Sequence, residues 1–181
     1  LMPETGGRGL WSAAARRAVL EHIVAGGDMA RVIRGGPRLF VGALAVDSGR
    51  ICHFMTGPEP SAQFQAHIEH ELGEIVMLRD TEDVMRAAMA SSAIPGVFEP
   101  VSIAGRDFVD AGGFSNQPLH VVLADEADAA LVVLMSPRGT NGPRAPTSTL
   151  FELGARLLEV ANWRDMQTEL KSLPAEWTLE S

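Results

Sequence analysis

The chain has 181 residues, 46% of them hydrophobic, and a formal net charge of -8. The length suits one domain and the apolar content supports a core, which together exclude general disorder. The 15 Lys and Arg residues are scattered in an acidic chain, so a nucleic-acid-binding surface is also excluded, because phosphate contacts need clustered basic side chains.

Cysteine usage and hydropathy favour a cytoplasmic location. Cys52 is the only cysteine, so an internal disulfide is impossible, as is usual in a reducing compartment. No apolar run approaches the roughly 18 residues of a membrane span. The first residues also lack the basic and apolar regions of a signal peptide.

The first half of the chain predicts two helices and then a pair of strands. A helix is expected over residues 13–24, and a short one capped by Asp28. Residues 39–46 are continuously apolar, as in a strand covered on both faces. The turn at 47–50 predicts a return strand over 51–54.

The middle of the chain continues with alternating elements. Residues 61–72 are ambiguous between a loop and a short polar helix, and residues 75–78 predict a strand. A helix starts at Asp80 or Thr81 and stops before Pro95, because the residue preceding a proline avoids helical angles. A small hairpin over 101–109 then leads to Asp110.

The last part predicts a helix from Pro118 to about residue 126, a buried strand over 129–135 and a long amphipathic helix over 148–172. Helices alternate with strands along the chain. The fold class is therefore α/β, a three-layer α/β/α arrangement with a mostly parallel sheet.

Asp110 is the main candidate for a catalytic residue because of its position at the end of a strand. It ends an apolar strand and precedes Ala111, Gly112 and Gly113. A strand end fixes the backbone, the glycines allow close approach of other groups, and a partly shielded carboxylate can act as a base. On local features alone, a turn aspartate bonded to backbone amides explains the pattern better.

A wider pattern surrounds this aspartate. Ala-Ser-Ser-Ala-Ile-Pro at 90–95 precedes it, and Asn116 and Pro118 follow it by six and eight residues. The order and spacing of these motifs resemble patatin-like acyl hydrolases, and the likeness runs over about residues 37–135. In that family the first glycine of the turn follows the aspartate directly, so Ala111 departs from the pattern and would be strained if the position needs a positive φ.

The resemblance implies a patatin-like α/β/α fold and a Ser-Asp dyad that cleaves acyl esters of lipids or phospholipids. Asp110 would take the serine proton, and Ala111, Gly112, Gly113 and Asn116 would shape its turn. No metal or organic cofactor is implied. Peripheral contact with a membrane is a further expectation of a lipid substrate.

The nucleophile of such a dyad is not in these 181 residues. The family places its serine in Gly-x-Ser-x-Gly at a strand-to-helix elbow. The nearest sequence begins at Gly113, and Gln117 breaks it. Residues 1–181 are therefore interpreted as the C-terminal portion of one patatin-like domain, incomplete and inactive alone. Such a chain is expected to associate with the missing N-terminal part or with itself through an open sheet edge.

Other candidate groups have ordinary structural explanations. Ser91 and Ser92 suit helix-end packing or capping, and His67 with His70 suits a solvated helix face rather than a metal site. Cys52 and His53 are neighbours in a strand and would point to opposite faces, which prevents a nucleophile–base pair.

Four further hypotheses stay open. Gly6-Gly-Arg-Gly resembles an oxyanion loop superficially, but no nucleophile elbow follows it. His120 is the histidine that a triad would use. The competing functional hypothesis is a non-catalytic interaction or structural module on the same scaffold, and a weaker one is a hydrolase that uses Ser92 or Ser115.

Overall fold

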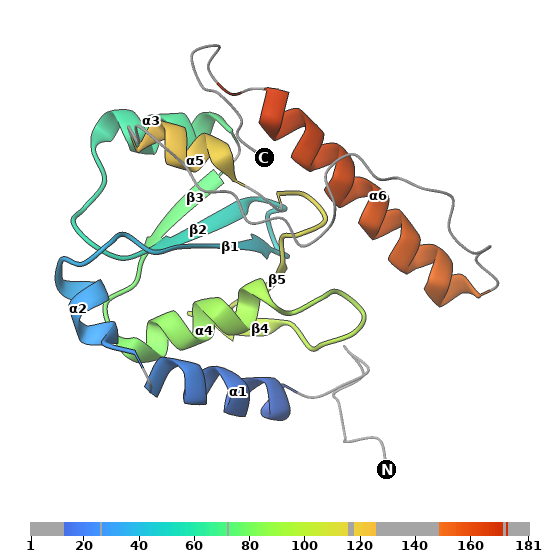
Figure 1. The fold of residues 1–181 in the computed structure, drawn as a ribbon, viewed down its shortest axis with the longest axis horizontal. Helices are drawn as coiled ribbons and strands as arrows, with labels where there is room; N and C mark the ends of the chain where they lie inside the picture. Colours follow the sequence, from blue (N-terminus) through green and yellow to red (C-terminus); the bar gives the residue numbers. More distant parts are fainter. Residues whose placement is uncertain are drawn as a thin grey trace, which may run out of the picture. The chain divides into compact units, whose positions relative to one another are not determined.

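The computed structural model describes residues 13–25, 27–71, 73–115, 118–125, 149–171 and 173. The chain divides into two compact units, Leu1–Ala111 and Gly112–Ser181. Among the described residues, the first unit contains a five-stranded sheet with four helices, and the second contains two helices (Figure 1).

The sheet of the first unit has the strand order β3-β2-β1-β5-β4. Its strands are β1 (Phe40–Ala45), β2 (Ile51–Met55), β3 (Gly73–Met77), β4 (Val101–Ile103) and β5 (Arg106–Asp110). Strand β1 is central and pairs with both β2 and β5. The two hairpins that the sequence predicts, β1–β2 and β4–β5, are both present.

The strand directions correct the prediction of a mostly parallel sheet. Within the described sheet, β2 and β3 run parallel, whereas the other three strand pairs are antiparallel. The connections account for much of this difference. The β1–β2 and β4–β5 links are short turns that cannot make a crossover, and β2 reaches β3 through helix α3 (Ala62–His70). The predicted α/β class is confirmed.

Helices cover both faces of this sheet. Helix α4 (Thr81–Ser91) packs on β1, β4 and β5, and α1 (Ala14–Ala25) packs on α4. The short helix α2 (Met29–Arg34) also contacts α4. Helix α3 contacts β3, and Figure 1 shows it on the opposite side of the sheet from α4 and α1.

Side-chain caps fix where three of these helices begin. Each capping oxygen accepts a hydrogen bond from the backbone N–H three residues later, which satisfies one of the unpaired donors of the first turn. The pairs are Asp28 with Arg31, Ser61 with Phe64, and Asp80 with Asp83. The predicted starts at Asp28 and Asp80 are confirmed.

The core of the first unit lies between the sheet and α4. Phe54 on β2 and Phe108 on β5 meet edge to face, with their ring centroids 5.3 Å apart. Ala87 and Ala90 face this pair from α4, and both are fully buried. Because these alanines are small, the helix can lie close to the sheet.

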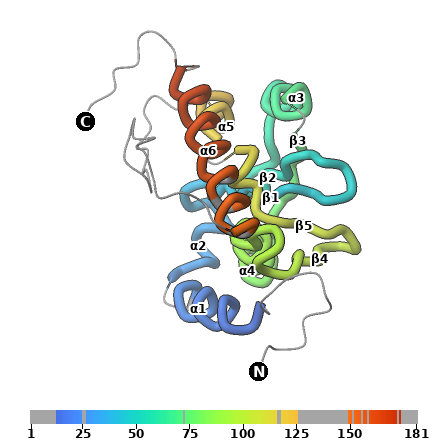
Figure 2. The backbone as a smooth tube through the Cα atoms, turned by 90° about the vertical axis from the view of Figure 1, so that its right-hand side faces the viewer, coloured from blue at the N-terminus to red at the C-terminus, as the bar shows by residue number. Residues whose placement is uncertain are grey.

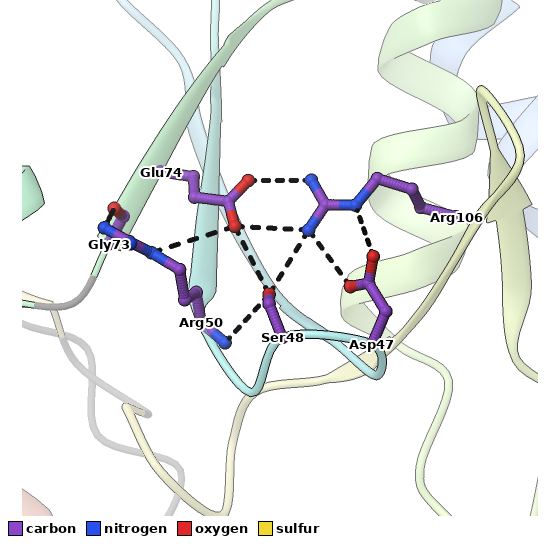
Figure 3. A network of polar contacts seen from close by, with 6 residues as sticks. All are labelled: Asp47, Ser48, Arg50, Gly73, Glu74 and Arg106. Carbon is purple, nitrogen blue, oxygen red and sulfur yellow. Dashed lines mark hydrogen bonds and ion pairs between the residues drawn. The ribbon is translucent and has the colours of Figure 1, made fainter.

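An ionic network joins the β1–β2 turn to β3 and β5 (Figure 3). Arg106 on β5 donates to the Asp47 carboxylate at 2.9 and 3.0 Å, and to the Glu74 carboxylate at 2.7 and 3.1 Å. Arg50 adds a hydrogen bond to the Gly73 carbonyl at 2.9 Å. The hydrogen bonds from Arg106 lower the pKa of Asp47 and the pKa of Glu74.

The second unit contains α5 (Leu119–Ala124) and α6 (Leu150–Lys171), which confirms two predicted helices. Figure 2 shows α5 alongside α6, and the two are in contact. The apolar stripe of α6 is buried at Met166 and exposed at Leu150, Leu153 and Leu157. The strand predicted over 129–135 lies outside the described residues. No helix in the described part of the chain is long and apolar enough to cross a membrane.

Gly73 begins β3 at a position with no room for a side chain. A Cβ there would lie 2.6 Å from Ile68 Cγ2 and 2.9 Å from the Ile68 carbonyl oxygen. We expect Gly73→Ala to lower the free energy of unfolding, measured by urea denaturation, by about 1–3 kcal/mol. Gly42→Ala is the matched control, because a Cβ on Gly42 in β1 meets nothing within 4 Å. An equal loss in both variants would show that the clash is not the cause.

The Arg106 network predicts a dependence of stability on pH. Because Asp47 and Glu74 have lowered pKa values in the folded chain, the stabilisation is present above their ordinary values of 3.8 and 4.5 and is lost as the pH falls through and below them. We expect thermal unfolding of Arg106→Met to show a weaker acid dependence than that of the wild type.

The matched control for this experiment is Arg79→Met, which removes an ion pair whose Arg79 and Glu59 side chains are 75% and 73% exposed. Its acid dependence is expected to match the wild type. A wild-type acid dependence in Arg106→Met would contradict the account.

Candidate active site

Asp110 is held at the end of β5 by the strand pairing around it. In the register of the sheet it lies opposite Ala43 of the central strand β1. The two residues before it, Phe108 and Val109, are buried and anchor β5 in the core. The Asp110 residue itself is half-buried. The sheet therefore fixes the backbone of this aspartate while its side chain keeps some access to solvent.

The segment after α4 is bonded directly to Asp110. The backbone N–H of Asp110 donates to the carbonyl of Ala93 at 2.9 Å, and Ala93 is fully buried. The Ala-Ser-Ser-Ala-Ile-Pro segment and the Asp-Ala-Gly-Gly turn, which the sequence offered as separate motifs, thus meet in one place. Because this hydrogen bond joins two backbone groups, it depends on the backbone conformation of the two segments and not on the side chains of Ala93 and Asp110.

Ser92 caps the end of α4, which is one of the two structural roles, packing or capping, that its position in the sequence suggests. It is the C-cap residue of α4, and its hydroxyl donates to the Ala88 carbonyl at 2.7 Å. A second, longer contact reaches the Met89 carbonyl at 3.3 Å. The hydroxyl is therefore engaged within the end of its own helix. In this arrangement it is not set up as a nucleophile.

Ala111 is not strained. Among the described residues, the only non-glycine residue with a positive φ is Ala104, in the β4–β5 turn. Ala111 therefore has an ordinary backbone conformation, and its methyl group is buried. Gly112 and Gly113 follow in a turn over 112–114, whereas Asn116 lies outside the described residues. The alanine in place of the family's first glycine is compatible with this turn.

Arg16 is the residue near Asp110 that sequence reasoning missed. It comes from α1, and its Nη1 group donates to the Ser92 carbonyl. Its guanidinium carbon lies 4.4 Å from the centroid of the Phe98 ring, a cation–π contact. Burial lowers the pKa of Arg16, and attraction by the Asp110 carboxylate opposes that change. The Nε and Nη2 atoms are buried and have no hydrogen-bond partner among the described residues.

Cys52 and His53 point to opposite faces of β2, as predicted. Cys52 belongs to the core cluster under α4, and desolvation by burial raises its pKa to about 12. His53 is also buried, and its ring lies on the side of Gly73 and Ile68. Because the thiolate is strongly disfavoured, Cys52 is unsuited to nucleophilic catalysis at neutral pH.

Helices α5 and α3 carry the other histidines that the sequence singled out. His120 on α5 lies 3.1 Å from Glu169 on α6 through its Nδ1 atom, and its backbone N–H donates to the same carboxylate at 3.3 Å. His67 and His70 are exposed on α3. Within the described ranges, no group of three His, Cys, Asp or Glu side chains is arranged to hold a metal ion.

One open cleft of about 470 Å³ lies away from Asp110. It is formed by α1, α2, α4 and the residues between α1 and α2, with Arg17, Glu82 and Met85 among its lining residues. Its lining does not include Asp110 or Arg16. The residues around the aspartate and this cleft are therefore separate features of the first unit.

Comparison with known families agrees with this arrangement. A family model described as patatin-like phospholipase matches residues 4–123, which is more than half of the chain and includes both motifs that meet at Asp110. The chain belongs to the patatin-like phospholipase family, a family of lipid acyl hydrolases. A comparison with curated proteins gives no match.

The burial of Cys52 predicts an unreactive thiol. We expect no measurable reaction of the native chain with a disulfide reagent such as dithionitrobenzoate at pH 8, because the residue is fully buried and its pKa is raised to about 12. In denaturant the same sample should release the signal of one thiol. Rapid labelling of the native chain would show that β2 opens or that the thiolate is stabilised.

Proposed function

We propose that this chain supplies the general base of a lipid acyl-ester hydrolase, and that Asp110 is that base. The Asp110 carboxylate would take the hydroxyl proton of a serine while the serine oxygen attacks the ester carbonyl. The alcohol would leave with that proton, and an acyl-serine would form. Water would then attack the acyl-serine, with Asp110 again taking a proton, and release the fatty acid.

The hydrogen bond from Asp110 to the Ala93 carbonyl, at 2.9 Å, is the observation that supports this proposal most. It fixes the backbone of a half-buried carboxylate between a buried strand and a buried helix end. A base needs a defined position relative to the hydroxyl that it deprotonates. Ala111, with its unstrained backbone, and the turn at Gly112 and Gly113 are compatible with such a position.

The serine is proposed to come from outside these 181 residues, because they contain no Gly-x-Ser-x-Gly. The chain would then be inactive alone and would work with an N-terminal part of the same domain. A lipid or phospholipid ester is the proposed substrate, which would bring the intact protein to a membrane surface. The described residues do not indicate which lipid head group the protein would recognise.

A non-catalytic module on the same scaffold is the second candidate. The missing nucleophile motif is the observation that favours it. Ala111 no longer does, since its backbone is not strained. Ser115, whose hydroxyl is buried without a hydrogen-bond partner among the described residues, is the remaining candidate for a nucleophile within the chain.

The proposal predicts a loss of hydrolysis when Asp110 loses its charge. In the polypeptide that contains this chain together with any upstream Gly-x-Ser-x-Gly segment, we expect Asp110→Asn to lower kcat for p-nitrophenyl butyrate and for phosphatidylcholine vesicles by about 100-fold or more. The reason is that an amide cannot accept the serine proton.

Asp107→Asn is the matched control, because Asp107 is a carboxylate on the same strand and on its other face. It should retain wild-type kcat. Full activity of Asp110→Asn would overturn the assignment of the base. Absence of any hydrolysis by the wild-type polypeptide would favour the non-catalytic module.

A further inference from the structure

We propose that Arg16 is a positioning residue for Asp110. It holds the segment after α4 against the end of β5, and it places a permanent positive charge beside the Asp110 carboxylate. This inference rests on the proposed function, because it assigns Arg16 a role that acts through the proposed base. Arg16 itself is not proposed to touch the substrate.

The contacts of Arg16 and of Asp110 converge on two consecutive carbonyl groups. Arg16 donates to the carbonyl of Ser92, and the Asp110 N–H donates to the carbonyl of Ala93. One peptide segment is thus held from both sides, by a side chain of α1 and by the backbone of β5. Displacement of that segment would move the aspartate with it.

The charge of Arg16 acts on the same aspartate. Attraction between the two side chains works against the effect of burial on Arg16. An arginine stays protonated in proteins, and a neighbouring cation favours the ionised form of a carboxylate. The ionised form is the one that can accept a serine proton. Arg16 would therefore maintain the base in its working state.

A packing role alone does not explain this arginine. Its Nε and Nη2 atoms are buried without a hydrogen-bond partner among the described residues, and unsatisfied buried donors destabilise a fold. An apolar side chain could pack on Phe98 without that penalty. A charged group in this place is understandable if its charge acts on Asp110.

Arg17, the next residue on α1, provides a matched comparison. Its side chain is 42% exposed and pairs with Glu21 at 2.7 Å and with Glu82 at 2.9 Å. Arg17 has the same side-chain chemistry and lies on the same helix, but its hydrogen bonds go to these two exposed carboxylates on α1 and α4. Substitution of Arg17 therefore measures the general effect of removing an arginine from α1.

The kinetic test compares Arg16→Met, Arg16→Lys and Arg17→Met in the polypeptide used for the hydrolysis of p-nitrophenyl butyrate. Arg16→Met is expected to lower kcat by about tenfold or more with KM changed less than twofold, since the base and not substrate binding is affected. Arg16→Lys, which keeps the charge, should recover part of the loss. Arg17→Met should match the wild type. Wild-type kcat in Arg16→Met, or equal losses in the Met and Lys variants, would overturn the proposal.

A thermal-unfolding cycle on the 181-residue chain tests the coupling without any need for activity. It compares the wild type with Arg16→Met, Asp110→Asn and the double variant. We expect the double variant to lose less in Tm than the sum of the two single losses, because each single variant already removes the shared attraction. Additive losses would overturn the proposal, whatever the kinetics show.

The kinetic test and the unfolding cycle together distinguish a wrong role for Arg16 from a wrong assignment of Asp110 as the base. If Asp110→Asn abolishes hydrolysis while Arg16→Met does not lower kcat, Asp110 stays the base and the positioning role of Arg16 is wrong. If Asp110→Asn hydrolyses esters like the wild type, the proposed function fails and the positioning role fails with it, even where the unfolding cycle shows coupling.

Discussion

The hydrogen bond between the Asp110 N–H and the Ala93 carbonyl is the contact on which the candidate active site depends. It joins the end of a buried strand to the end of a buried helix. Packing fixes both of these elements. Strand β5 is paired with the central strand, and α4 lies close to the sheet because Ala87 and Ala90 are small. A change in the packing of α4 would therefore be transmitted to the aspartate.

The ionic network around Arg106 lies apart from the aspartate in the first unit. The Arg106 network ties the β1–β2 turn, β3 and the start of β5, and it lies at the opposite end of β5 from Asp110 (Figure 3). Arg16, whose positive charge interacts with the aspartate, is half-buried. The proposed base, Asp110, and the Arg106 network thus lie at opposite ends of one five-residue strand.

Much of the fold could be predicted because helix caps, apolar runs and turn residues act locally. Asp28 and Asp80 begin helices as expected, and Asp110 ends its strand. The predicted strand directions were wrong because the alternation of helices and strands was taken to indicate a parallel sheet. The turns that join β1 to β2 and β4 to β5 are too short for a crossover, so these pairs are antiparallel. Arg16 could not be found from the sequence, because its contact with Ser92 spans 76 positions and depends on how α1 packs on α4. The predictions for Asn116 and for residues 129–135 fall outside the described residues.

The central claim is that Asp110 accepts the proton of a serine supplied by the intact protein. The most direct measurement is an experimental structure of that protein after its reactive serine has been labelled with a fluorophosphonate. The account predicts the label on the serine of a Gly-x-Ser-x-Gly elbow, with that serine Oγ about 3 Å from an Asp110 carboxylate oxygen. A label on Ser92 or Ser115, or a labelled serine beyond hydrogen-bond reach of Asp110, would contradict it.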